Sequence, residues 1–447
     1  MRLAPVAAAL LTAALIAACN NRAETGPGPS GPTPPPASPT TAPAATPTTP
    51  PTAPAEPRTT APSGRATGPQ GHDASLALAH VQALAAAPRV AGTPAELRAV
   101  EYLEQTLAAY GYQVERMPFT FENDPYRVGE VRVGGTPVEA LTMAGSPGGT
   151  VEAPAVHIGL ADDAGIAGRD LTGRIAVAER GTLTFAAKYR NAAAAGAIGL
   201  IVVNNQPGPF SGNLTLEAAF PVVAIAREDG QAILAAARAG ATLAIAAPPT
   251  IGPTTAYNVI AHAPGQPTCR IVVGGHFDTV PGAPGANDNA SGTANVLELA
   301  RTLALQGPVP GLCFALFGAE ESGLHGSKAL VQRLRTAGTL PRYMVNLDVT
   351  GIGTRVEVIG NTPAALRAID LTTANGIPAV ASTLPPNTGS DHMSFADAGV
   401  EVVFFTSGDF STIHSPQDTV DAIDQATLDA IGDAAYLLIR DLLAQLD

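Results

Sequence analysis

The sequence predicts an α/β protein whose core is a mixed, mostly parallel twisted sheet flanked by helices, with a second domain of mixed α/β structure. The first observation is an alternation of strand and helix patterns from residue 251 to the C-terminus. Several of these strand segments are apolar throughout, as strands covered on both faces are. The second observation is a change of character over residues 124–250, where short β-like runs predominate. A chain of 447 residues is long enough for two folded domains.

The N-terminal part has the composition of an export signal and a tether. Residues 1–19 contain Arg2 and an apolar run that is too short to span a bilayer, which is typical of a secretory signal. The order Ile-Ala-Ala-Cys that ends at Cys19 resembles the bacterial lipobox. We therefore expect an exported chain whose contact with the membrane is a lipid anchor at Cys19; a plain signal peptide that is cut nearby, with secretion, is the alternative. Residues 20–71 are rich in proline and threonine and predict a disordered, extended tether.

Residues 72–123 predict a helix, a loop, a second helix and a strand. Apolar residues recur at helical spacing from Leu76 to Leu84, and Gly92 and Pro94 then interrupt the pattern. Gly111 ends the second helical pattern, and the segment "YQVERMPFTF" after it alternates as a strand does.

Residues 124–250 alternate short β runs with turns and two alanine-rich helices. The runs are "PAVHIGL", "RIAVAER", "IGLIVVNN" and "PVVAIAR". This pattern by itself predicts a second domain of mixed α/β structure. The segment contains no cluster of titratable residues, so we expect no catalytic residue in it.

The C-terminal part, residues 251–447, supplies most strands of the predicted sheet. Its strand segments include "CRIVVGGHFD", "GLCFALFGAEE", "RYMVNLDVTG" and "VEVVFFTSG". Helices are expected over residues 291–306, 325–336 and 363–375, with a long one from Thr419 onward. In such sheets ligands bind beyond the carboxyl ends of the strands, so the functional site is expected there.

The charge balance argues against nucleic acid as a partner. Asp and Glu outnumber Lys and Arg by 38 to 25, which gives a net charge of −13. Lysine occurs only at Lys188 and Lys328, so no basic cluster offsets this charge. An acidic protein is repelled by phosphate backbones and by anionic membrane surfaces.

At five places in the C-terminal part an apolar strand runs into an acidic residue or a histidine. The residues are His276 and Asp278, Asp288 in the following loop, Glu320 and Glu321, Asp348, and His414. Burying an unpaired charge costs free energy, and several carboxylates cannot compensate one another's charge. Cations must therefore lie close to them. None of the arginines lies near these strand ends in the sequence, which favours a metal ion as the cation.

Two histidines with several carboxylates and no thiolate form a ligand set that suits Zn²⁺. Two zinc ions about 3.5–4 Å apart need one carboxylate that binds both. Asp288 is the natural bridge, because it lies in a glycine-rich loop whose backbone can approach closely. Taken alone, each of these residues is explained as well by a turn, a helix cap or a solvated edge; the ordered set favours metal.

Five segments together resemble the M28 family of di-zinc exopeptidases, in its aminopeptidase branch: "GGHFD…GANDNASGT", "FGAEESGLHGS", "NLDVTG", "GSDHMSF" and "IHSPQDT". The resemblance runs from about residue 72 to the C-terminus. It implies the zinc exopeptidase fold, two zinc ions per chain, and hydrolysis of peptide substrates that have a free N-terminus.

The resemblance also implies a role for each candidate residue. His276 and Asp348 would bind one zinc, Glu321 and His414 the other, and Asp288 both, with Glu320 as the general base on the metal-activated water and Asp278 steadying His276. The family further implies a cis peptide bond between Asp288 and Asn289.

The residue pattern agrees with these roles. Residues two apart on an extended strand face the same side, so Asp278 can accept the imidazole N–H of His276 that is not used for metal. Neighbouring side chains point apart, so Glu321 can bind metal while Glu320 meets the water.

The segment from "DLTGRIAVAERG" to "AILAAARAG" resembles the protease-associated (PA) domain, a β-rich insert of exported peptidases. In that family the module shapes substrate access or partner contacts and carries no catalytic residue. The expected organisation is therefore a PA insert over residues 124–250 within a peptidase domain formed by residues 72–123 and 251–447.

Other polar residues in or near the motifs receive no metal role. The family places Asp391 and His392 beside the site, but a helix cap at Ser390 or Asp391 explains this segment as well. Asp418 is expected to cap the last helix. Ile413 stands where some family members have a tyrosine that can hydrogen-bond the oxyanion, and the sequence indicates no replacement. The remaining histidines are expected to be structural or solvated, namely His72, His80, His157 and His262.

Cys269 precedes His276 by seven residues (276 − 269 = 7), and Cys313 precedes Glu320 by the same number (320 − 313 = 7). In parallel neighbouring strands they would lie at the same level of the sheet. Because export permits oxidation, a disulfide between them is expected, with two buried thiols as the alternative.

The predicted function is that of an exported zinc aminopeptidase. A carboxypeptidase would need arginines to hold the C-terminal carboxylate of its substrate, and none flanks the motifs. A glutaminyl-cyclase-like transferase with a single zinc and a non-catalytic binding protein on the same scaffold are the alternatives. The full set of five metal ligands argues against both.

Overall fold

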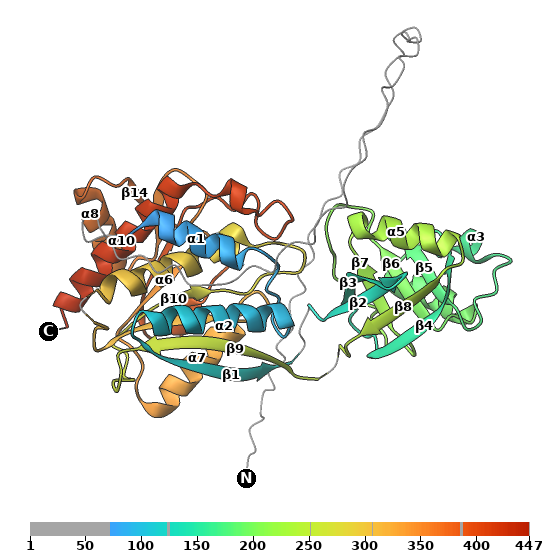
Figure 1. Ribbon diagram of the computed structural model, residues 1–447, viewed down its shortest axis with the longest axis horizontal. Coiled ribbons are helices and arrows are strands. Elements are labelled where there is room, and N and C mark those ends of the chain that lie inside the picture. Colours follow the sequence, from blue (N-terminus) through green and yellow to red (C-terminus); the bar gives the residue numbers. More distant parts are fainter. Residues whose placement is uncertain (1–71, 123–125, 251, 306, 385–387, 447) are drawn as a thin grey trace, which may run out of the picture. The chain divides into compact units, whose positions relative to one another are not determined.

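The computed structural model describes residues 72–446 with the exception of residues 123–125, 251, 306 and 385–387 (Figure 1). The predicted signal peptide, the Cys19 anchor and the tether over 20–71 lie outside the described residues. Within the part of the chain that is described, no helix has the length and apolarity needed to cross a bilayer.

An eight-stranded mixed sheet forms the centre of the predicted peptidase part, in the order β1-β9-β11-β10-β12-β15-β13-β14. Its strands are β1 (Gln113–Phe121), β9 (Thr254–His262), β10 (Ile271–His276), β11 (Leu312–Phe317), β12 (Tyr343–Leu347), β13 (Val356–Ile359), β14 (Ala379–Ser382) and β15 (Glu401–Thr406). The central strands β11, β10, β12 and β15 run parallel to one another. Antiparallel pairs lie toward the two edges. The predicted mixed, mostly parallel sheet is confirmed.

Helices cover both faces of this sheet. They are α1 (Ala74–Leu84), α2 (Pro94–Ala109), α6 (Gly292–Leu303), α7 (His325–Ala337), α8 (Pro363–Ala374), α9 (His392–Ala396) and α10 (Gln425–Ala444). Alternate residues of a strand point to opposite faces, so Ile271 and Val273 enter the larger core with α1, α2, α6, α8 and α10. Val272, between them, enters a smaller core with α7 and α9. This double coverage explains why the strands read as apolar throughout.

Local signals set several helix boundaries. The side chain of Asp73 caps α1, and Thr93 followed by Pro94 begins α2. The prediction for the last helix was wrong by six residues: α10 begins at Gln425, where Asp424 caps it, and Thr419 precedes only a short 3₁₀ turn, η2 (Val420–Ala422).

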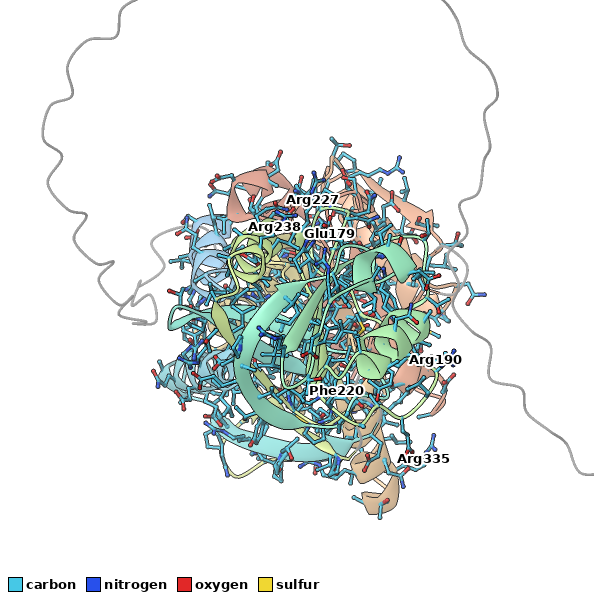
Figure 2. All side chains as sticks on the ribbon, turned by 90° about the vertical axis from the view of Figure 1, so that its right-hand side faces the viewer. Glu179, Arg190, Phe220, Arg227, Arg238 and Arg335 are labelled. Atoms are coloured by element: carbon cyan, nitrogen blue, oxygen red, sulfur yellow. A yellow bond between two sulfur atoms is a disulfide. The ribbon has the colours of Figure 1, made fainter. Side chains whose placement is uncertain are left out.

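The predicted insert folds into a closed barrel of seven strands in the order β2-β3-β7-β6-β5-β4-β8. They are β2 (Val128–Val133), β3 (Thr136–Thr142), β4 (Gly149–His157), β5 (Ile175–Glu179), β6 (Gly199–Val203), β7 (Val222–Ile225) and β8 (Thr242–Ala247), with helices α3 (Asp163–Ile166), α4 (Phe185–Ala194) and α5 (Arg227–Arg238). Glu179 lies 3.6 Å from Arg238 on its surface (Figure 2) and 2.9 Å from His157. Neither of the residue groups that could hold a metal in the described chain lies in this barrel.

A disulfide joins Cys269 and Cys313, as expected. The register behind that expectation was wrong, because His276 pairs with Phe317 rather than with Glu320. Cys269 instead lies just before β10 begins, from where its sulfur reaches Cys313 on β11.

His80 is a structural histidine in the described fold, as the sequence predicted. It is fully buried, with Nδ1 2.6 Å from the hydroxyl of Tyr102 and Nε2 3.1 Å from the hydroxyl of Tyr110. Burial, and secondarily the charge of Arg301, lowers the pKa of His80 to about 4. The folded protein therefore keeps this imidazole neutral at pH values where the unfolded chain protonates it.

We expect His80 to make the protein less stable in acid. Because its pKa is depressed in the folded state, its contribution is complete above pH 6.5 and is lost as the pH falls toward 4, up to about 3 kcal/mol. Urea unfolding across this range should show a smaller pH slope for His80→Gln than for the unsubstituted protein. Equal slopes would contradict the prediction.

Candidate metal centre

The carboxyl ends of four adjacent strands meet at one edge of the sheet. The chain leaves β10 and forms β11 on one side of it and β12 on the other, which is the switch point where α/β sheets open a crevice. His276 is the last residue of β10, and Asp348 follows β12 directly. Glu320 and Glu321 follow β11, and His414 lies in the loop after β15. The sheet thus gathers residues that are far apart in the sequence.

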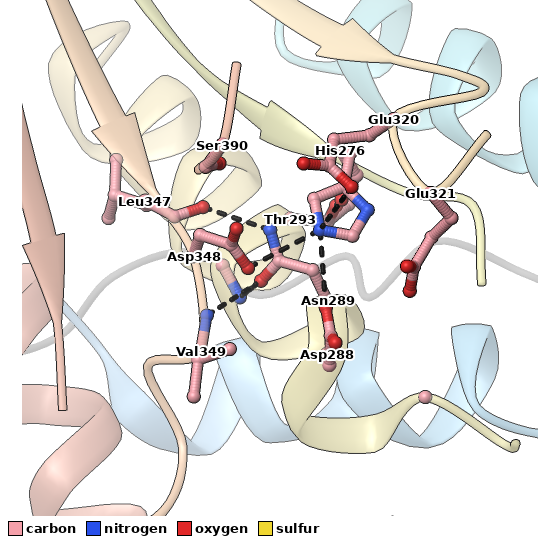
Figure 3. A network of polar contacts seen from close by, with 12 residues as sticks. His276, Asp288, Asn289, Thr293, Glu320, Glu321, Leu347, Asp348, Val349 and Ser390 are labelled. Atoms are coloured by element: carbon pink, nitrogen blue, oxygen red, sulfur yellow. Dashed lines mark hydrogen bonds and ion pairs between the residues drawn. The ribbon is translucent and has the colours of Figure 1, made fainter. Parts of the chain in front are cut away.

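His276, Asp288 and Asp348 form the first group of potential metal ligands, and all three are buried. Nε2 of His276 lies 3.2 Å from Oδ1 of Asp288 and 3.3 Å from Oδ1 of Asp348 (Figure 3). One imidazole N–H cannot serve two carboxylates at once, and Oδ1 of Asp348 has no partner with hydrogen-bond geometry. A cation at this point would satisfy all three side chains.

Asp288, Glu321 and His414 form the second group. Nε2 of His414 lies 3.1 Å from Oδ2 of Asp288 and 3.0 Å from Oε2 of Glu321. The other oxygen of Glu321 is buried without a hydrogen-bond partner.

Asp288 is the residue that the two groups share. Its Oδ1 faces His276 and its Oδ2 faces His414, so each oxygen belongs to a different group. Tetrahedral zinc with bonds of about 2.0–2.1 Å separates its ligand atoms by about 3.3 Å. The spacings from each histidine nitrogen to its carboxylate oxygens are 3.0–3.3 Å, and the ligand atoms of each group all lie within 4.8 Å of one another. The residues present therefore fit two zinc ions bridged by one carboxylate.

The surrounding carboxylates raise the pKa of both histidines. Burial lowers the pKa of His276, but the nearby carboxylates, first of all those of Asp348 and Glu320, raise it by more. The pKa of His276 therefore stands well above its ordinary value. Hydrogen bonds to Asp288 and Glu321 raise the pKa of His414 to about 11. Burial raises the pKa of Asp288, yet the two histidines bring it below its ordinary value. The cluster has an excess of negative charge that attracts cations.

Glu320 belongs to neither group of potential ligands. Its Oε2 lies 4.0 Å from Nε2 of His276, and its side chain diverges from that of Glu321 (Figure 3). Burial raises the pKa of Glu320 well above its ordinary value, and burial together with Asp288 raises the pKa of Glu321 to about 7. Glu321 therefore belongs to a group of potential ligands, whereas Glu320 lies beside both groups.

Asp278 contacts both glutamates through their backbone. The N–H groups of Glu320 and Glu321 donate to its two oxygens at 3.1 and 3.3 Å. Its Oδ1 lies 3.5 Å from Nδ1 of His276, while the carbonyl oxygen of Asp278 lies nearer to that nitrogen, at 3.3 Å. Asp278 thus links the ends of β10 and β11 and orders both sides of the site.

Unusual backbone marks the same edge of the sheet. Ala319, Val349 and His414 have φ values of 54°, 54° and 56°, a left-handed conformation that costs free energy in residues other than glycine. Asp288 and Asn289 are joined by a cis peptide bond, as the resemblance implied. The Asn289 amide donates to the carbonyl of Leu347 and accepts from the N–H of Val349 (Figure 3).

Two aspartates near the site do not form the helix caps that the sequence suggested for them, as an alternative for Asp391 and as the expectation for Asp418. Asp391 stands at the start of α9 but makes no capping hydrogen bond, and both of its oxygens are buried without a partner. Burial raises the pKa of Asp391 to about 7. Asp418 does not cap the last helix; its carboxylate accepts from the backbone N–H groups of Asn287 and Asp288 at 2.7 and 3.0 Å.

The sequence reasoning missed Arg89. It had excluded an arginine near the strand ends on sequence distance alone, yet Arg89 is 2 % exposed and donates to the carbonyl of Phe277, between His276 and Asp278. The available signal was an arginine directly after the first helical pattern, in "RVAGTPAE".

Comparison with known proteins gives two matches to family models. The model of peptidase family M28 matches residues 258–439, and the PA domain model matches residues 146–233. The aminopeptidase YwaD of Bacillus subtilis is 31% identical over 371 residues, which cover 77% of this chain and 79% of that protein. The chain belongs to peptidase family M28. It is a metallo-exopeptidase with a PA domain.

Two further similar proteins extend the comparison. The solved structure of BSAP, a zinc aminopeptidase from Bacillus subtilis, has a TM-score of 0.60 at 28% identity, covering 84% of this chain and 96% of that one. A probable lipoprotein aminopeptidase of Mycobacterium tuberculosis, LpqL, is 33% identical over 272 residues, which cover 55% of this chain and 51% of that protein. The chain thus spans about half the length of that relative.

Proposed function

We propose that this M28 peptidase is an exported aminopeptidase that removes N-terminal residues from peptides and uses two zinc ions. The observation that carries the proposal is the pair of ligand groups that share Asp288, with the carboxylate of Glu320 beside them and outside both groups. Bound zinc would supply Lewis-acid polarisation of the scissile carbonyl and would acidify the attacking water.

The residues of this chain would divide the remaining work. His276 and Asp348 would hold one zinc, Glu321 and His414 the other, and Asp288 both. Glu320 would take a proton from the attacking water and deliver it to the leaving amine, because its carboxylate reaches the site without belonging to a ligand group. Asp278 would steady His276 and the two glutamates through the contacts described above.

An amino-terminal specificity fits the charge of the site. A free α-amino group is a cation, and the described site carries acids in excess. A carboxypeptidase would need a free guanidinium for the substrate carboxylate. The guanidinium of Arg89 is buried and donates to backbone carbonyls, so it is not available for that purpose.

Export as a lipoprotein is supported by the sequence around Cys19 and by the name of the LpqL relative. Because that segment lies outside the described residues, this part of the proposal depends on sequence alone. Mass spectrometry of the mature N-terminus would detect a lipid on Cys19 or an unmodified residue at the cleavage site.

A metal count alongside a substrate panel tests the function. We expect about two zinc ions per chain and release of p-nitroaniline from aminoacyl-p-nitroanilides, with loss of activity on chelation and recovery with zinc. Substrates blocked at the amino group should resist cleavage. Release of carboxyl-terminal residues alone would contradict the proposal, and about one zinc per chain with cyclisation of N-terminal glutamine would favour a glutaminyl-cyclase-like enzyme.

A further inference from the structure

Arg89 is a buried charge whose guanidinium donates its hydrogen bonds to neutral backbone carbonyl groups. Its Nε donates to the carbonyl of Phe277 at 2.6 Å, and Nη1 and Nη2 donate to the carbonyls of Pro284 and Gly285 at 2.9 Å each. Nη1 also donates to Leu84 at the end of α1. Isolating a guanidinium from water in this way is costly unless nearby charge compensates.

The compensating charge lies in the metal centre. Burial lowers the pKa of Arg89 to about 10, while the carboxylates of Asp278, Asp418 and Asp288 raise it in turn, so the guanidinium remains charged at neutral pH. Arg89 is therefore a fixed cation at the border of an acid-rich site.

The segment that Arg89 holds leads into the bridging ligand. The carbonyls of Phe277, Pro284 and Gly285 lie on both arms of the loop between His276 and Asp288. The backbone N–H of Arg89 also donates to the hydroxyl of Thr279 at 2.8 Å. At Gly285 the loop adopts φ 64°, and an added Cβ would lie 3.1 Å from the guanidinium. The loop is packed against Arg89 rather than merely near it.

Asp418 holds the rest of the same segment. Its carboxylate accepts from the N–H groups of Asn287 and Asp288, and its carbonyl accepts from Ala286 at 3.2 Å. Arg89 thus binds the carbonyl groups before the bridging ligand, and Asp418 binds the N–H groups that lead up to and include it. Both side chains are buried, with Asp418 fully inaccessible.

We propose that Arg89 and Asp418 are a pair of positioning residues that fix the backbone of residues 277–288, so that the Asp288 carboxylate stands between the two zinc sites before metal binds. The inference rests on the proposed two-zinc site. Groups that orient metal ligands from outside typically change metal affinity by about 10–100-fold.

Zinc affinity of the full chain tests this, measured by competition with a chelator of known affinity on Arg89→Met and Asp418→Asn. We expect both substitutions to raise the zinc dissociation constant about 10–100-fold and to lower kcat with little change in KM. The zinc dissociation constant of Arg89→Lys should lie between those of the unsubstituted protein and Arg89→Met. An ammonium group keeps the positive charge but cannot donate to three loop carbonyls at once, as the planar guanidinium does.

Arg301 provides a matched control. It is another buried arginine of the same domain, 6 % exposed, but it pairs with Glu298 instead of the metal loop. Arg301→Met should lower the thermal midpoint of the zinc-free protein while its zinc affinity stays within about twofold. A purely structural role for Arg89 predicts the same outcome for Arg89→Met.

The proposal is overturned if Arg89→Met and Asp418→Asn bind zinc as the unsubstituted protein does, or if Arg301→Met loses zinc to the same extent. If Arg89→Met does not fold, the zinc affinity of Asp418→Asn tests the proposal by itself. Because zinc affinity is read without substrate, an absence of aminopeptidase activity in the unsubstituted protein would contradict the proposed function and leave this comparison valid. A protein that binds no zinc would contradict both.

Discussion

Glu320→Gln should lower kcat by about 10²–10⁴-fold and leave about two zinc ions bound per chain. Glutamine keeps the size and the polarity of the side chain but cannot accept the proton of the attacking water. Because Glu320 belongs to neither ligand group, its loss should not release metal. Stopped assays on an aminoacyl-p-nitroanilide, with metal analysis of the same sample, would measure both quantities.

The neighbouring residue offers a control of identical chemistry. Glu321→Gln makes the same change one residue away, but its Oε2 lies 3.0 Å from Nε2 of His414 in the second ligand group. This variant should lose activity together with about one zinc ion. Near-normal activity in Glu320→Gln, or equal zinc loss in the two variants, would contradict the assignment of the general base.

The proximity of the proposed metal ligands was predictable from sequence because a parallel sheet imposes a simple rule. Strands that run in the same direction end at the same edge, so polar residues after His276, Phe317 and Leu347 must lie near one another. The rule brings side chains close together where the strands are neighbours, as β11, β10 and β12 are. It also requires that each strand be recognised, and the apolar runs made that possible.

The positioning residues were not predictable in this way. Arg89 contacts the loop after His276 across almost 190 residues of sequence, and an arginine in the loop that follows a helix is ordinarily a solvated residue. Asp418 was interpreted through its nearest helix, although its carboxylate faces a loop about 130 residues away. Sequence patterns indicate the periodicity and the caps of single elements. The contacts of Arg89 and Asp418 instead depend on how helices, strands and loops pack in the folded protein.

The cysteines show that a correct prediction can rest on an incorrect register. Equal spacing to two site residues suggested that Cys269 and Cys313 lie at one level of the sheet, but the register pairs Val272 with Cys313. The disulfide forms because the chain before β10 passes close to β11. Spacing along the chain predicted proximity without predicting strand pairing.

Asp288→Ala should have the largest effect of any single substitution in the site, because it is the ligand that both groups share. We expect zinc content to fall well below one ion per chain and activity to fall by at least about 10³-fold. The backbone N–H of residue 288 would still donate to Asp418, so the loop should keep its path while losing the carboxylate.

Single-site ligands provide the comparison that makes this result specific. Asp348→Asn should weaken the group of His276, and Glu321→Gln the group of His414, so each should retain about one zinc. If the two metals were bound independently, Asp288→Ala would resemble one of these variants. Loss of both ions from Asp288→Ala alone would show that one carboxylate connects the two sites, as the opposite orientation of its oxygens toward the two histidines requires.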